Sequence, residues 1–464
     1  MKYVTLLFLA CTFIVAPVLA QSGPPRIIDV ETLKKEHEEM KVTMESIKKN
    51  HGEDSLAKYM ASRMVKDREN WIKNRKLKQE EDAALRLDEY TNETSPGDVT
   101  ELNLSDMNLT EIPDFVYKYK NLKKLNLSNN KISKLPKEFK ELQVLEDLNL
   151  TNNSLSTVKF KTSKLMSVKR LNLSGNELVS FPKKANKFKK LDCLNLSNNG
   201  FESIPKRVKK YKELKTIEID RNNLVQFGSN FKHLKKIETL ESISAGGSNI
   251  SSVPDNISLL TNITSLFLQG NKINYVSPEI GKLVGLEQLS LYKNQLKEIP
   301  QEIFNCTELF ELDLFYNQLR LLPKGFSKLK KLPNLYLAYN ELEYLPGDLG
   351  EMNLVRIYVH DNKLTSLPQS LSELTELEVI RFDNNYIAQF PIQLLNLENL
   401  TYIDFSKTDV AILPKEIVDY QRLELLVFDG YRIDTTDPHN ENYDSVMKQL
   451  LERGVTLNVT NDAE

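Results

Sequence analysis

Side chains with catalytic or metal-binding chemistry are scarce in this chain. Its 464 residues include three cysteines and one tryptophan. The five histidines have no metal-ligand spacing; they are His37, His51, His233, His360 and His439. The sequence has no CxxC, HExxH or G-x-S-x-G motif and no phosphate-binding glycine loop. We therefore expect no enzyme, no cofactor and no bound metal.

Long apolar runs are also missing, except at the start. The run from Tyr3 to Val15 follows Lys2, and Val18-Leu19-Ala20 precedes Gln21. This order is typical of a secretory signal, because the run is too short to span a bilayer comfortably and small residues mark a cleavage point. The polar tail carries no lipid-anchor or retention signal. The sequence predicts a secreted, extracellular protein with no membrane span after cleavage.

One pattern, L-x-L-x-x-N-x-L-x-x-L-P, recurs about fifteen times between Leu102 and Ile433. Successive copies are 23 residues apart, except for one step of 26 and one of 22. A fixed period of this length is the signature of a solenoid. In each copy L-x-L reads as a strand with both leucines on one face, and the Asn amide can bond backbone groups in the turn that follows. We expect an Asn ladder broken at Met107, Ser248, Thr408 and Tyr431.

The repeat resembles the leucine-rich repeat family over roughly 335 residues. Its length is similar to the short class found in cytoplasmic Ras-pathway scaffolds and their plant relatives, and the G-x-I-P signature of plant extracellular repeats is absent. The resemblance implies an α/β solenoid, a curved horseshoe of about fifteen repeats with a parallel sheet on its concave face. Extracellular relatives mostly have cysteine-rich caps. Here Cys193 and Cys306 lie about 20 Å apart by strand spacing, too far for a disulfide.

The chain divides into four segments. Residues 1–20 are the signal peptide, 21–97 a helical N-terminal region, 98–434 the solenoid and 435–464 a C-terminal cap. The N-terminal region is interpreted either as a helical cap or as a short coiled coil that forms a dimer. In the C-terminal cap, Asp437-Pro438 is expected to start a helix, and Val455 to Leu457 a last strand.

Charge divides the solenoid into two halves. Residues 115–236 carry 28 Lys and Arg against 10 Asp and Glu, a net of +18, whereas residues 237–464 carry 18 against 33, a net of −15. Most of the lysines follow the Leu-Pro step and are predicted to form a basic outer strip. The polyanion-binding candidates are Lys183, Lys184, Lys187, Lys189, Lys190, Lys206, Arg207, Lys209 and Lys210. The strip either keeps the surface soluble or binds a polyanion: a sulfated glycan, an anionic lipid or a nucleic acid. Secretion favours the glycans. It lacks interleaved aromatics, which argues against binding of single-stranded nucleic acid.

The inner face changes halfway along the solenoid. Asparagines occupy the position between the strand leucines in the first five repeats, whereas later repeats place aromatic and charged residues there and just beyond the strand. Strand alternation turns these side chains away from the core, and their composition is typical of protein interfaces. The protein-binding candidates are Phe267, Tyr292, Phe315, Tyr316, Tyr336, Tyr339, Tyr358, His360, Arg381 and Asp383.

Fourteen N-x-S/T sequons suggest a glycoprotein. Several belong to the repeat itself, at a strand spacing too narrow for a glycan on every strand. Those in linker or outer positions are the better acceptors: Asn92, Asn256, Asn262, Asn305 and Asn399.

The sequence thus favours a secreted, non-enzymatic binding protein that engages a protein ligand or receptor through its concave face, in recognition, receptor binding or adhesion. One alternative is an extracellular matrix component held to sulfated glycans by the basic strip. Another is an intracellular signalling scaffold whose apolar N-terminus is not a signal. The basic and acidic halves offer a second route to a dimer.

Overall fold

The structure is a computed structural model of the chain. It describes residues 81–92, 95–156, 167–181 and 188–460, together with scattered residues between 62 and 77. The chain forms two units, Met1–Glu81 and Asp82–Glu464. Described residues of the first unit are helical, and the predicted signal peptide, residues 1–20, lies outside the described residues. In the described part of the chain, no helix is long and apolar enough to cross a membrane.

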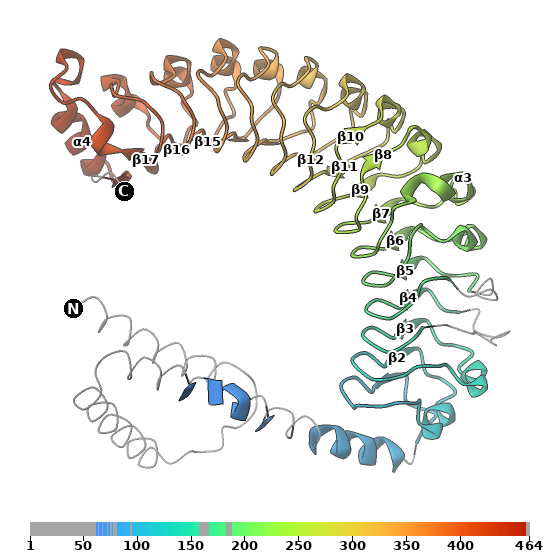
Figure 1. The fold of residues 1–464 in the computed structure, drawn as a ribbon. Coiled ribbons are helices and arrows are strands. Elements are labelled where there is room, and N and C mark those ends of the chain that lie inside the picture. The colour runs from blue at the N-terminus through green and yellow to red at the C-terminus, as the bar shows by residue number, and fades with distance from the viewer. Residues whose placement is uncertain are drawn as a thin grey trace, which may run out of the picture. The chain divides into compact units, whose positions relative to one another are not determined.

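The second unit is a curved solenoid with one parallel sheet of 16 strands along its inner side (Figure 1). Fifteen strands come from successive repeats, and the last follows the C-terminal helix. In sheet order they are β1 (Glu101–Asn103), β2 (Lys124–Asn126), β3 (Asp147–Asn149), β4 (Arg170–Asn172), β5 (Cys193–Asn195), β6 (Thr216–Glu218), β7 (Ser242–Ser244), β9 (Ser265–Phe267), β11 (Gln288–Ser290), β12 (Glu311–Asp313), β13 (Asn334–Tyr336), β14 (Arg356–Tyr358), β15 (Val379–Arg381), β16 (Tyr402–Asp404), β17 (Leu425–Asp429) and β18 (Thr456–Thr460). The repeat period predicted from the sequence therefore sets the strand order.

The strands pair in register because each repeat presents the same leucine to the core. Leu102, Leu125 and Leu148 are Cα partners in β1, β2 and β3, and each is at most 2% exposed. The residue after this leucine points to the opposite face. A column of side chains that do not pack into the core therefore runs along the concave face.

The Asn ladder holds the turn after most repeat strands, whereas Ser248 and Thr408 stand at two of the other positions and donate from their hydroxyls to backbone carbonyls. Asn130 donates from Nδ2 to the carbonyls of Leu104 and Leu127 at 2.8 and 3.0 Å, and its Oδ1 accepts from the Leu109 amide at 2.8 Å. Asn153 repeats this pattern one turn later. Each side chain satisfies backbone groups of two adjacent repeats, which would otherwise be buried without partners.

Short helical turns cover the outer side (Figure 1). Most begin directly after the Leu-Pro step, where the proline is extended and the chain then makes a single 3₁₀ turn. They are η2 (Asp114–Lys118), η3 (Lys137–Glu141), η4 (Lys206–Lys210), η5 (Phe227–Asn230), η6 (Asp255–Leu259), η7 (Pro278–Lys282), η8 (Gln301–Asn305), η9 (Phe326–Lys328), η10 (Leu349–Glu351), η11 (Gln369–Glu373), η12 (Ile392–Asn396) and η13 (Lys415–Asp419). A two-stranded sheet, β8 (Ser252–Val253) and β10 (Tyr275–Val276), lies in the return segments.

The 26-residue repeat differs from the others by an α-helical turn, α3 (Phe231–Leu234), which continues from η5. Phe231 and Leu234 are buried, and α3 packs against η4 and η6 of the adjoining repeats. The extra residues of the 26-residue step thus form this helical turn on the outer side of the repeat.

Both ends of the solenoid are covered. Residues 82–91 are helical, Ala83 is buried against the core, and the hydroxyl of Tyr119 donates to the Tyr90 carbonyl at 2.6 Å. At the other end η14 (Gly430–Arg432) and η15 (Pro438–Asn440) lead into α4 (Tyr443–Glu452), and β18 then pairs with β17. Val446 and Leu450 of α4 are buried, whereas Leu451 is 58% exposed.

Candidate protein-binding face

Six aromatic side chains from β11 to β14 and the turns after them gather on the concave side. We call this set the aromatic cluster: Tyr292, Phe315, Tyr316, Tyr336, Tyr339 and Tyr358. Every member is half-buried or exposed. They come together because β13 and β14 pair Tyr336 with Tyr358 in register, and β12 aligns with β13 in the same way.

The rings form two connected groups. In one, Tyr316 and Tyr339 stack with ring centroids 4.1 Å apart and planes 7° apart, and Tyr292 meets Tyr316 edge-on at 5.4 Å. In the other, Tyr336 and Tyr358 stack at 5.6 Å, and Phe315 meets Tyr336 edge-on at 5.3 Å. Such ring pairs stabilise one another, so the cluster presents a fixed surface.

His360 joins the two groups. Its ring lies 5.1 Å from Tyr339 and 6.1 Å from Phe315, edge-on to both. The sequence predicts a contact role for His360, yet the residue is only 5% exposed. Its position therefore suits a support beneath the cluster better than a direct contact.

Tyr316 and Tyr339 have left-handed backbone conformations, with φ of 54° at both. At this position of other repeats, Asn129, Asn152 and Asn198 have φ of 56°, 52° and 53°, and the longer side chains of Arg221, Lys293 and Lys407 occur there with φ of 53°. Asparagine tolerates this conformation, whereas a bulky residue is costly there. Tyr316 and Tyr339 are also 40% and 39% exposed. These two tyrosines thus expose large rings on a backbone that does not favour them, and such a pair suits contact with a partner.

Charged side chains border the cluster on β15 and β16. The Arg381 guanidinium donates to both carboxylate oxygens of Asp383 at 3.2 and 3.1 Å and lies 3.3 Å from an Asp404 oxygen. Burial and repulsion from Asp404 raise the pKa of Asp383 to about 7. Burial lowers the pKa of His360. The network therefore holds one carboxyl group, that of Asp383, that titrates near neutral pH beside the rings.

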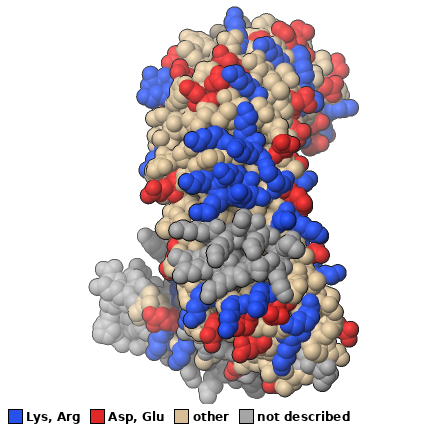
Figure 2. All heavy atoms as spheres, turned by 90° about the vertical axis from the view of Figure 1, so that its right-hand side faces the viewer, with Lys and Arg blue, Asp and Glu red and all other residues tan. Residues whose placement is uncertain are grey.

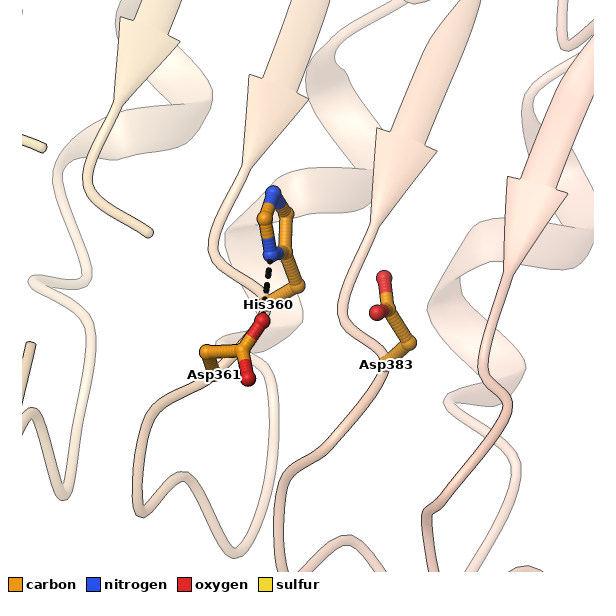
Figure 3. A group of neighbouring side chains, drawn as sticks. All are labelled: His360, Asp361 and Asp383. Atoms are coloured by element: carbon orange, nitrogen blue, oxygen red, sulfur yellow. Dashed lines mark hydrogen bonds and ion pairs between the residues drawn. The ribbon is translucent and has the colours of Figure 1, made fainter. Parts of the chain in front are cut away.

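His360, Asp361 and Asp383 are close enough to share a metal ion, with ligand atoms within 4.8 Å of one another (Figure 3). The His360 Nδ1 and Asp361 Oδ2 already form a hydrogen bond of 2.8 Å. Asp383 accepts both of its hydrogen bonds from Arg381, so a cation would have to displace a guanidinium that already neutralises this carboxylate. The arrangement fits an ion-paired support for the neighbouring rings better than a metal site.

The remaining candidates of the concave face differ in position. Phe267 on β9 is half-buried and makes no ring contact with the aromatic cluster among the described residues. Asp383 is 8% exposed and thus supports Arg381. Tyr402, which is not among the candidates predicted from the sequence, donates from its hydroxyl to Asp404 at 3.2 Å and extends the charged border. Its position just before the strand leucine also faces outward, and that is the signal that could have identified it.

The other candidate surfaces lie elsewhere. Lys183, Lys184 and Lys187 are outside the described residues, whereas the other members of the basic strip are exposed or half-exposed. Four of the proposed glycan acceptors already donate from Nδ2: Asn92, Asn256, Asn262 and Asn399. Asn256 is also half-buried. Among the described residues, Asn305 is the candidate whose amide is exposed and forms no hydrogen bond.

Comparison with known proteins identifies the repeats. Residues 98–155 and 284–342 match the family model described as leucine rich repeat. A leucine-rich repeat protein of Leptospira interrogans is 29% identical with a TM-score of 0.69, and the match covers 80% of this chain and 97% of that protein. No curated protein sequence matches the chain.

Two proteins of Listeria monocytogenes share the fold at lower identity. An internalin is 18% identical with a TM-score of 0.54, covering 67% of this chain and 88% of that one. The functional domain of InlJ is 18% identical with a TM-score of 0.55, covering 72% and 68%. At this level of identity the likeness concerns the fold alone.

Proposed function

Because the chain belongs to the leucine-rich repeat family, we propose that it is a secreted, non-enzymatic binding protein whose concave face holds a protein ligand or receptor through the aromatic cluster. The fold supports this proposal, because a solenoid of this kind offers an extended curved surface. Recognition, receptor binding and adhesion are all compatible with it.

The observation that carries the proposal is the pair of stacked tyrosines in left-handed backbone. Tyr316 and Tyr339 are exposed at a position where several other repeats have asparagine. Strained backbone that persists in a structure is a sign of function. Tyrosines are enriched among the residues that dominate binding energy at protein interfaces, because they bury a large rigid surface at low entropic cost.

The stacked pair Tyr336 and Tyr358 provides the test of the proposal. Wild-type protein carrying an affinity tag is used to capture a protein partner, and the affinity for that partner is then measured for the variant Tyr336→Ala/Tyr358→Ala. We expect binding to weaken by about thirtyfold, the effect of removing a central anchor worth roughly 2 kcal/mol.

The matched control is Tyr344→Ala/Tyr386→Ala. These two tyrosines are 58% and 62% exposed and make no ring contact with the cluster among the described residues. The control should bind like the wild type, with both variants melting as cooperative folded proteins. Equal affinity of the cluster variant and the control would exclude this face as the binding site.

The proposal of export is supported by the sequence Met1 to Ala20. If the chain is exported, Asn305 is the best-placed glycan acceptor of the five considered, because its side chain is exposed and its amide is free among the described residues.

A further inference from the structure

A second surface lies on the outer side of the solenoid, on η4 and α3. The sequence predicts a broad basic strip there, and the structure concentrates part of it. We call the following residues the lysine patch: Lys206, Lys209, Lys210, Lys232, Lys235 and Lys236. Figure 2 shows Lys and Arg side chains gathered in a band across this outer face.

The patch exists because the 26-residue repeat has an α-helical turn where its neighbours have only a 3₁₀ turn. η4 carries the sequence Lys206-Arg207-Val208-Lys209-Lys210, with Val208 buried and the charged residues turned outward. α3 packs against η4 and adds Lys232, and Lys235 and Lys236 directly follow it. Two repeats therefore contribute lysines to one area.

His233 reports how closely these charges approach one another. Its pKa is lowered by burial and by the positive charges of Lys209, Lys232, Lys236 and Lys206. One imidazole thus lies within the electrostatic reach of four ammonium groups from η4 and α3.

The charge of the patch is poorly compensated. Within the described residues, no carboxylate lies within ion-pairing distance of the ammonium groups of Lys206, Lys209, Lys210, Lys232 or Lys235. By contrast, Lys169 and Arg170 in an earlier repeat pair with Glu146 and Asp147 at 2.8 Å. Like charges held together without counter-charges repel one another, and an anionic ligand would relieve that repulsion.

We propose that the lysine patch binds a sulfated polysaccharide of the glycosaminoglycan type. A linear polyanion can follow the curve from one repeat to the next, across neighbouring turns of the outer side. This proposal concerns a different surface from the aromatic cluster and does not depend on it.

Three features favour a sulfated glycan over nucleic acid. The large aromatic residues of these repeats are buried, as Tyr211, Phe227 and Phe231 show, so the described residues around the patch offer no platform on which unpaired bases could stack. α3 has only four residues, too short to enter the major groove of duplex DNA as a recognition helix. Lysines outnumber arginines, and compact ammonium groups suit charge neutralisation more than bidentate base recognition.

The test compares two variants of the full chain that lose the same charge. The patch variant is Lys206→Ser/Lys209→Ser/Lys232→Ser/Lys235→Ser. The control is Lys272→Ser/Lys297→Ser/Lys324→Ser/Lys328→Ser, in which four exposed lysines without ion pairs among the described residues are replaced in the acidic half. Affinity for heparin is measured over a range of salt concentrations, with thermal melting to show that both variants are folded.

We expect the patch variant to bind heparin about tenfold more weakly and with a smaller salt dependence, since each exposed ionic contact contributes a few tenths of a kcal/mol. The control should bind like the wild type. In the nuclear magnetic resonance spectrum, heparin should raise the pKa of His233 by offsetting the neighbouring lysines and leave the signals of His439 unchanged.

Each of the following results would overturn the proposal. Equal weakening in both variants would mean that heparin responds to diffuse charge and not to this patch. Tighter binding of a 20-base-pair DNA duplex than of heparin at the same salt would assign the patch to nucleic acid. Failure of the wild type to bind heparin at low salt would leave the lysines with a solubilising role only.

Discussion

Replacing Tyr316 and Tyr339 together by asparagine separates binding from folding. Both residues have φ of 54°, and asparagine is the residue that Asn129, Asn152 and Asn198 provide at the same place in other repeats. The variant therefore places asparagine at the left-handed turn position, as in those repeats, and removes only the two tyrosine rings.

The expected change in the free energy of unfolding is small because opposing effects are of similar size. A left-handed conformation costs an ordinary residue roughly 1 to 2 kcal/mol, and asparagine avoids much of this cost. The stacked pair, 4.1 Å apart, contributes about 0.5 to 1.5 kcal/mol, and the half-exposed rings lose a similar amount of apolar burial. We expect a stability within about 1 kcal/mol of the wild type.

Chemical denaturation monitors folding, and surface plasmon resonance measures the affinity for the captured partner. Phe405→Ala serves as the folding control, because Phe405 is 2% exposed and removal of a buried aromatic costs about 3 to 5 kcal/mol. The asparagine variant should lose at least tenfold in affinity while keeping its stability. A loss of stability as large as that of Phe405→Ala would refute the reasoning, because the two tyrosines would then belong to the core.

Two further predictions concern export and pH. Material secreted by a host cell should begin at or near Gln21, and recovery only from the cytosol with Met1 intact would contradict export. Asp383 has a pKa of about 7 in the folded protein against an ordinary value of 3.8, so its contribution to stability falls as pH rises from about 4 to about 7. The Asp383→Asn variant has no titrating group at this position, so its stability relative to the wild type should improve between pH 5 and pH 8. Thermal melts of both proteins at several pH values measure this change. If the difference in melting temperature between the two proteins stays constant with pH, the raised pKa is ruled out.

The repeat pattern alone predicts most of the fold. The strand leucines from Leu102 to Leu426 lie in the register that the 23-residue period requires, and the family model confirms the leucine-rich repeats. The reason is that each repeat packs only on its neighbours, so the pattern within one repeat determines the arrangement of the whole solenoid. The curved solenoid with its parallel inner sheet follows directly.

Features that depend on side-chain packing across repeats were harder to predict. The sequence places His360 and Asp383 on the binding face, whereas both are nearly buried beneath or beside larger groups. Alternation along a strand gives the direction of a side chain, but the size of its neighbours decides its exposure. The left-handed backbone of Tyr316 and Tyr339 was equally hidden, because tyrosine is not a residue that indicates such a turn.

The lysine patch also depends on packing across repeats that the sequence does not predict. The sequence locates many lysines after the Leu-Pro step but does not reveal that α3 brings Lys232 beside η4. The contacts between these outer turns depend on the three extra residues of the 26-residue repeat. The repeat pattern does not predict their conformation, because they have no counterpart in the other repeats.

The two proposed surfaces occupy opposite sides of one scaffold and share no residue. The aromatic cluster lies on the inner strands and turns from β11 to β14, and the lysine patch lies on the outer turns η4 and α3. Substitutions at distant sites without common partners usually have additive effects on free energy. A variant that combines Tyr316→Asn/Tyr339→Asn with the four lysine substitutions should therefore lose affinity for the protein partner and for heparin to the same extent as the separate variants, because each repeat of a solenoid contacts only its neighbours and the two surfaces lie on different repeats.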